Sequence, residues 1–171
     1  MTPNVRAFSE ALMSSVEVVT HGVDATTQLG QHLGALLRGG DVLCLSGDLG
    51  AGKTALARGL ALGWGALEPV SSPTFVFVHE HRRRADAQRL YHVDCYRLQS
   101  EADAATIGLE DMLTGEDVVL LEWPEQVESL LPADRLWISI ETLDDNTRRF
   151  TAEAVGKRHL ALLTDLQTQV K

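Results

Sequence analysis

The chain has 171 residues, of which 44% are hydrophobic and 23% are charged, and its formal net charge is −9 at pH 7. A chain of this length is expected to form one domain, residues 1–171, with a substantial core. Its mean hydropathy is −0.04, and no apolar run reaches the length of a bilayer span, so a membrane-spanning class is excluded. The acidic charge argues against direct nucleic-acid binding, which needs a basic surface, although a partner could bind the nucleic acid instead.

The N-terminal region and the cysteines indicate a cytoplasmic protein. Residues 1–19 lack the succession of charged, apolar and small residues that marks a signal peptide. Cys44 and Cys95 lie in predicted core strands without metal-type spacing, so we expect both thiols to be reduced.

Strands and helices are predicted along most of the chain after a start, residues 1–15, that has no clear element and is expected to be flexible. Apolar, β-branched or aromatic runs predict strands at residues 16–19, 42–45, 75–80, 90–96, 118–121, 136–140 and 150–155. Helical spacing and helix-forming residues predict helices at residues 25–37, 55–62, about 100–105, 109–113 and 157–171, with Asp24 and Ser100 as N-caps. The pattern predicts an α/β chain with a three-layer P-loop NTPase fold and a mixed, mainly parallel central sheet.

Residues 75–80 and 90–96 are expected to form a hairpin within the otherwise parallel sheet. Arg82, Arg83 and Arg84 stand at the predicted turn between them. Three like charges at a turn are interpreted as a solvated tip, with a contact to RNA or to an acidic partner as the alternative.

The segment that begins at Gly47 reads Gly47-Asp48-Leu49-Gly50-Ala51-Gly52-Lys53-Thr54, the G-x-x-x-x-G-K-T pattern of a phosphate-binding loop. It follows a predicted strand and precedes a predicted helix, which is the context that the motif requires. Glycines allow positive φ angles, so successive backbone N–H groups can surround a phosphate at the positive end of the helix. Residues 48–54 are therefore predicted to bind ATP phosphates, with Lys53 at the outer phosphates and the Thr54 hydroxyl on Mg²⁺.

A glycine-rich turn with an incidental lysine is the alternative for this segment. Lys53 is the only lysine before Lys157, and every other cation in that span is an arginine. A single lysine at this position favours a specific role over general solubility.

Two acids are candidates for the metal and for the attacking water. Glu122 follows the apolar run 118–121 and is expected at the carboxyl end of a central strand, where ligands bind in such sheets. It could hold Mg²⁺ or orient water, or it could face solvent. Asp94 is the second candidate, on one strand face with His92 and Tyr96.

Several neighbouring residues each have two interpretations. His92 is interpreted as a packed or capping histidine in preference to a catalytic one, and no other His or Cys has the spacing of a shared metal site. Thr74 follows Pro73 in a loop that could sense the γ-phosphate, or it is a turn residue. Trp123 packs in the core or faces a partner, and Arg97 contacts phosphate or forms a surface ion pair.

Four motifs together resemble the TsaE (YjeE) family, the bacterial ATPases of tRNA threonylcarbamoyladenosine synthesis. They cover roughly residues 25–149, and the phosphate-binding loop alone would be shared by many families. In order, they are the loop at residues 47–54, Ser72-Pro73-Thr74-Phe75, His92-Val93-Asp94-Cys95-Tyr96-Arg97-Leu98 and Leu121-Glu122-Trp123-Pro124.

The resemblance implies a cytoplasmic protein that binds ATP and Mg²⁺ and has weak ATPase activity alone. It implies work with TsaD and TsaB, which install the threonylcarbamoyl group next to the anticodon, so that tRNA is met only indirectly. By motif match, Lys53 binds phosphates, Thr54 and Glu122 hold Mg²⁺, and Asp94 and Trp123 occupy functionally important positions.

The same match makes Thr74 the switch-like threonine and places residues 23–26, including Thr26, beside the adenine. The sequence departs from the family at Val76-Phe77, where Thr-Leu is frequent, and at Cys95, where Leu is common. From about Asn146 the match is loose, and no function is assigned there.

Other functions compatible with a phosphate-binding loop remain as alternatives. A small-molecule P-loop kinase would need an arginine-bearing lid, and the sequence offers none beyond residues 82–84. A regulatory GTPase is disfavoured because no Asn-Lys-x-Asp tetrad occurs. A non-catalytic module that holds ATP structurally is the fourth possibility.

Overall fold

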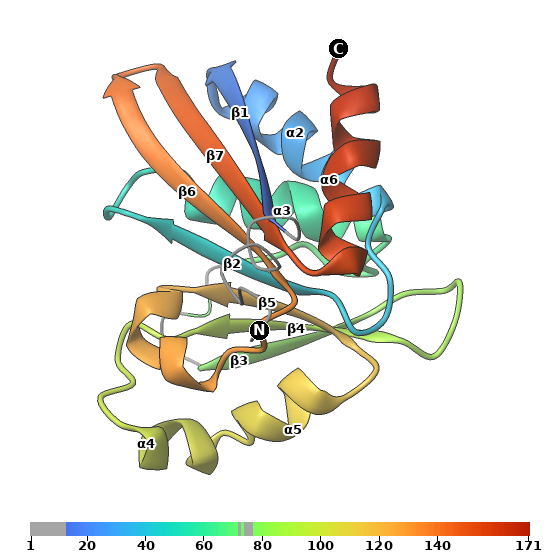
Figure 1. The fold of residues 1–171 in the computed structure, drawn as a ribbon, viewed down its shortest axis with the longest axis vertical. Coiled ribbons are helices and arrows are strands. Elements are labelled where there is room, and N and C mark those ends of the chain that lie inside the picture. Colours follow the sequence, from blue (N-terminus) through green and yellow to red (C-terminus); the bar gives the residue numbers. More distant parts are fainter. Residues whose placement is uncertain (1–12, 72, 74–76) are drawn as a thin grey trace, which may run out of the picture.

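The computed structural model describes residues 13–71, 73 and 77–171, and its strands join in one seven-stranded sheet (Figure 1). The strands are β1 (Met13–His21), β2 (Val42–Gly47), β3 (Val78–Arg82), β4 (Arg89–Asp94), β5 (Val118–Glu122), β6 (Arg135–Asp144) and β7 (Thr147–Val155). The helices are α2 (Val23–Ala35), α3 (Lys53–Trp64), α4 (Glu101–Thr106), α5 (Leu109–Thr114), the 3₁₀ helix η1 (Pro124–Leu130) and α6 (Lys157–Gln169).

The sheet is mixed, in the order β1-β7-β6-β2-β5-β4-β3. The four central strands β6, β2, β5 and β4 are parallel to one another, while β3 and the β7–β1 side pair antiparallel. The expected mixed sheet is confirmed, but it is not mainly parallel, because three of its six strand pairs are antiparallel. Short turns connect β3 to β4 and β6 to β7, and such turns permit only antiparallel pairing.

Helices cover both faces of the sheet, and each face has its own apolar cluster. In Figure 1, α2, α3 and α6 lie on one side, and α4 and α5 lie on the other. Side chains alternate along β2, so that Leu43 and Leu45 join the first cluster and Val42 and Cys44 join the second. This double burial explains why the β2 and β5 segments are uninterrupted apolar runs.

Most predicted elements are confirmed, with shifted ends. The Ser100 cap is present, since its side chain accepts a hydrogen bond from the Asp103 N–H at 3.1 Å. The hairpin of β3 and β4 and the C-terminal helix are also present. Of the strand predicted at residues 75–80, residues 75 and 76 lie outside the described residues.

Two predictions at the N-terminal end were wrong. The predicted flexible start is wrong for residues 13–15, which belong to β1 and pair with β7; residues 1–12 lie outside the described residues. Backbone pairing with β7, which needs no apolar pattern, extends the strand. Asp24 does not cap α2. The cap position is Gly22 (φ 88°), whose N–H donates to the Asn146 carbonyl at 2.7 Å, and Asp24 lies in the first turn.

Within the described part of the chain, no helix is both long and apolar enough to cross a bilayer.

Candidate nucleotide site

The loop at residues 47–54 joins the carboxyl end of β2 to the start of α3. Gly50 and Gly52 have φ angles of 79° and 110°, in the left-handed region that glycine adopts readily. Among the described residues no side chain caps the N-terminus of α3, and its first turn carries no acid. The N–H groups of the first helical turn and the helix dipole therefore form a site suited to an anion.

Lys53 is folded against its own loop. Its ammonium donates hydrogen bonds to the carbonyls of Gly47 and of Asp48, the latter at 2.9 Å, and lies 4.1 Å from the centre of the Trp123 ring. The residue is 6% exposed. Burial lowers the pKa of Lys53, while the Glu122 carboxylate opposes this shift by favouring the charged form.

Asp94 and Glu122 lie side by side at the same edge of the sheet. They are the last residues of β4 and β5, and the parallel register places them opposite each other. Both are buried, at 7% and 3% exposure. Asp94 accepts a hydrogen bond from the Tyr96 N–H at 3.0 Å, and Glu122 is bonded to His92 Nε2 at 3.0 Å.

These groups surround a cavity of about 370 Å³. It brings Lys53 and Thr54 together with Asp94, Glu122 and Trp123, as the sequence predicts. The full lining consists of Leu49, Gly50, Gly52, Lys53, Thr54, Asp94, Tyr96, Glu122 and Trp123. Of the other loop residues, Leu49 is 91% exposed at the tip, and Ala51 is buried.

Trp123 has a left-handed backbone (φ 56°), which is unique among the non-glycine residues that the structure describes. Such a conformation costs on the order of 1–3 kcal/mol and persists only where the surroundings impose it. The ring packs against Tyr96, with centroids 4.9 Å apart, and partly against the apolar cluster below. The residue thus serves core packing and also covers Lys53.

Thr26 lies apart from this cavity, in a smaller one of about 120 Å³. Gly50 and Gly52 line both cavities, so the two adjoin at the loop. The Thr26 hydroxyl is bonded to the Thr20 hydroxyl at 2.8 Å. Thr74 lies outside the described residues, so its predicted role at the γ-phosphate stays a prediction.

The oxygen donors at the larger cavity fit Mg²⁺. Mg²⁺ is usually bound through one or two carboxylates together with phosphates and water. The Thr54 hydroxyl and the Glu122 carboxylate could supply such ligands, with Asp94 adjacent. In the parts of the chain that the structure covers, no cluster of three His, Cys, Asp or Glu residues forms a complete metal cage.

The sequence interpretation missed two contributors to this site and one contact of a third. His92, already placed on the strand face of Asp94, is packed as expected, but it also bonds Glu122. Arg148 donates from Nε to the Ala51 carbonyl at 3.1 Å, and Glu125 is hydrogen-bonded to Ser46 at the end of β2. The last two contacts have no local signal, because tertiary pairing brings the segments together.

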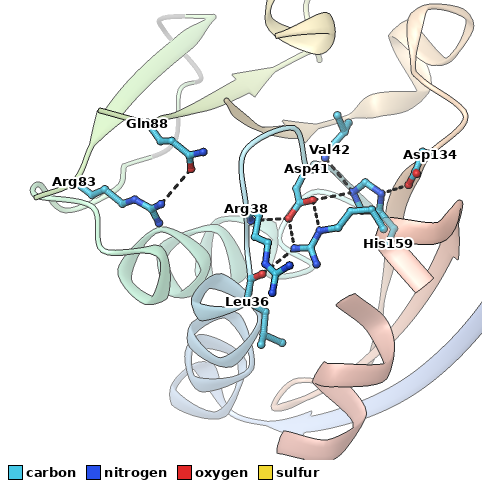
Figure 2. Close-up of polar contacts among 9 residues, drawn as sticks. Leu36, Arg38, Asp41, Val42, Arg83, Gln88, Asp134 and His159 are labelled. Atoms are coloured by element: carbon cyan, nitrogen blue, oxygen red, sulfur yellow. Dashed lines mark hydrogen bonds and ion pairs between the residues drawn. The ribbon is translucent and has the colours of Figure 1, made fainter. Parts of the chain in front are cut away.

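The arginines at the β3–β4 turn differ from one another. Arg82 and Arg84 are exposed, as expected of a solvated tip. Arg83 is half-buried and bonds both carboxylate oxygens of Asp86 at 2.8 and 2.6 Å. It also bonds the Gln88 side chain at 3.1 Å, as Figure 2 shows. It also lies over the Trp64 ring, so it fixes the turn.

Arg97 and the two cysteines are the remaining residues for which the sequence made a prediction. The Arg97 guanidinium lies 4.8 Å from the centre of the Phe77 ring. Cys44 and Cys95 are free, buried thiols, as expected. Burial raises the pKa of both to about 12, so neither is a reactive thiolate near neutral pH.

The sequence of this chain matches one family model and several proteins that carry the same name. The family model described as threonylcarbamoyl adenosine biosynthesis protein TsaE matches residues 20–150. The chain is 37% identical over 154 residues to the tRNA threonylcarbamoyladenosine biosynthesis protein TsaE of Bacillus subtilis, covering 90% of this chain and 95% of that protein. It is 41% identical over 140 residues to the protein of the same name from Mycobacterium leprae, covering 78% and 87%.

A solved structure shares the fold. The crystal structure of Bacillus subtilis YdiB superposes with a TM-score of 0.77 at 32% identity, covering 93% of this chain and 98% of that one. The family match spans most of the chain and includes the loop, both carboxylates and Trp123. On this evidence, the chain belongs to the TsaE family.

Proposed function

We propose that this protein is a P-loop ATPase that acts in the threonylcarbamoyladenosine modification of tRNA next to the anticodon. The proposed pathway is the one that the names of the related proteins state. One observation supports the nucleotide chemistry above all: a single cavity places Lys53 and Thr54 of the loop opposite the buried pair Asp94 and Glu122.

The groups that line the cavity divide between phosphate, metal and water in this proposal. The backbone of residues 48–52 and Lys53 bind the phosphates, and the Thr54 hydroxyl and Glu122 bind Mg²⁺. Bound Mg²⁺ neutralises phosphate charge during transfer to water. Asp94 and Glu122 hold the attacking water, and Trp123 restrains Lys53 until a phosphate competes for it. The fold belongs to the three-layer P-loop NTPases.

The proposed setting is the cytoplasm, with TsaD and TsaB as partners that raise a weak basal ATPase. The formal net charge of −9 supports a role in which the partners hold the tRNA. A small-molecule kinase would release a phosphorylated metabolite, whereas this proposal requires free phosphate, so product analysis separates the two.

Substitution of Lys53 tests the nucleotide site. Charge-assisted contacts of this kind are worth about 2–5 kcal/mol, so Lys53→Ala should weaken ATP binding in calorimetry by about 30-fold or more. Lys157→Ala, at an exposed position that begins α6, is the matched control and should bind as the unaltered protein does. Equal ATP affinity of both variants would overturn the proposed site.

A further inference from the structure

We propose that His92 is a positioning residue, which orients the Glu122 carboxylate toward Mg²⁺ and the attacking water. The inference deepens the proposed ATPase function and rests on it. It assigns a role to a histidine for which sequence reasoning favoured packing or capping.

The geometry places one histidine nitrogen on one carboxylate oxygen. His92 lies on β4 opposite Leu120 of β5, so Glu122 is two residues further along the neighbouring strand, on the same sheet face. His92 Nε2 and Glu122 Oε1 are 3.0 Å apart. The His92 side chain is fully buried, and that of Glu122 is 5% exposed, so water does not compete freely for this bond.

The direction of this hydrogen bond follows from which of the two groups can donate. An ionised carboxylate only accepts, so Nε2–H of His92 must donate to Oε1 of Glu122. Nδ1 is then an acceptor in the neutral ring and a second donor in the protonated ring; in either form it is buried without a partner among the described residues. An unpaired buried group costs about 1–3 kcal/mol. A leucine, like its neighbours Leu90 and Leu120, would fill the space without that cost, so packing alone does not explain a histidine here.

The bond has a consequence for the other carboxylate oxygen. With Oε1 held by His92, the rotamer of Glu122 is fixed and Oε2 remains for a ligand. The neighbouring Asp94 is held independently by the Tyr96 N–H, so each acid has its own restraint. Groups that orient metal ligands in this way typically change metal affinity or activity by about 10–100-fold when removed.

Two substitutions separate positioning from packing. His92→Leu keeps an apolar filling and removes the donor, while His92→Gln can present an N–H near the former Nε2 position. We expect His92→Leu to lower kcat for ATP hydrolysis, measured with the partner subunits, by about 10–100-fold. ATP affinity measured without Mg²⁺ should change less than about twofold, because the loop and Lys53 are untouched. His92→Gln should recover most of kcat.

His81→Leu is the matched control, since His81 is a buried histidine of the adjacent strand β3 that does not line the cavity. It should leave kcat unchanged. A second readout does not depend on hydrolysis: calorimetric titration of Mg²⁺ into the protein with a non-hydrolysable ATP analogue. His92→Leu should raise the Mg²⁺ concentration needed for half-maximal binding of the analogue by about tenfold or more. The affinity for the analogue in EDTA should be unchanged.

The outcomes are distinguishable. Unchanged kcat and unchanged Mg²⁺ dependence in His92→Leu would overturn the inference, as would equal losses in the Leu and Gln variants, which would indicate packing. If the unaltered protein released no phosphate even with its partners, the proposed ATPase function would fail. The Mg²⁺ titration would then decide the role of His92 alone.

Discussion

Two buried charged side chains, Asp41 and Lys53, differ in the groups that stabilise them. The Asp41 carboxylate, fully buried, accepts hydrogen bonds from Arg158 and from the Arg38 N–H (Figure 2). Among the described residues, the Lys53 ammonium donates its hydrogen bonds to loop carbonyls and not to a carboxylate. In the proposed function, this difference separates a structural charge, Asp41, from one that binds phosphate, Lys53.

His81 predicts a pH dependence of stability. It is 8% exposed, and its Nε2 is buried without a partner among the described residues. Burial, with smaller contributions from His92 and His79, lowers its pKa below the ordinary value of 6.5. The unfolded chain therefore binds more protons than the folded one once the pH falls below about 6.5, and stability falls with it.

The measurement is urea unfolding at pH 7.5 and at pH 5.5. The unaltered protein should lose more unfolding free energy between these conditions than His81→Leu, which lacks the titrating group. His32→Leu, at an exposed position of α2, should behave as the unaltered protein does. Identical losses in the His81 variant and the unaltered protein would contradict the prediction.

Among the secondary-structure elements, helices α2 and α3 pack with their backbones in direct contact. Each has two glycines four residues apart on the shared face: Gly30 and Gly34 on α2, and Gly59 and Gly63 on α3. A Cβ on Gly34 would lie 2.1 Å from the Leu60 carbonyl oxygen, and one on Gly63 would lie 2.1 Å from that of Gln31. Helix α3 begins at the end of the loop at residues 47–54, so this contact also positions that end of the loop.

Gly34→Ala should therefore destabilise the protein although alanine is the better helix former. The clash is with backbone, which cannot rotate away, and overpacking of this kind costs about 1–3 kcal/mol. Urea unfolding should show a lower midpoint than for Gln28→Ala, an exposed substitution in the same helix. A Gly34→Ala protein as stable as the parent would mean that the helices can separate without loss.

For the whole molecule, one polar cluster attaches the C-terminal helix to the centre of the sheet. Arg158 of α6 bonds both oxygens of Asp41 at 2.8 and 2.7 Å and the Leu36 carbonyl at 2.9 Å (Figure 2). Next to it, His159 Nε2 accepts from the Val42 N–H at 3.2 Å. The cluster lies at the start of β2, whereas the phosphate-binding loop follows the end of the same strand.

Arg158→Ala would leave the Asp41 carboxylate buried without its charged partner. Loss of one member of a buried pair costs about 3–5 kcal/mol, and the low end applies here because the Arg158 side chain is 26% exposed. Chemical unfolding should report this loss, with Lys157→Ala, exposed one residue earlier, close to the parent. ATP affinity of the folded protein should persist, and a stable Arg158→Ala protein would show that the cluster is dispensable.

Local signals in the sequence were sufficient to predict the loop, most strands and helices, and the positions of the two acids at the strand ends. The loop motif carries its own geometry, since glycine positions determine where positive φ angles occur. The apolar runs that end at Leu45 and Leu121 identified the central strands, and the acid after the second run identified Glu122. Hydrophobic periodicity reports burial along one segment, and that information is local.

Only the tertiary structure decided how distant segments meet. Three contacts join distant residues: the His92–Glu122 bond spans 30 positions, the Arg148 contact to Ala51 spans 97, and Met13 of β1 pairs with Val155 of β7. The left-handed backbone of Trp123 is likewise imposed by its neighbours. Strand order and register determine these contacts, and they arise when the whole sheet assembles, so no stretch of sequence encodes any of them by itself.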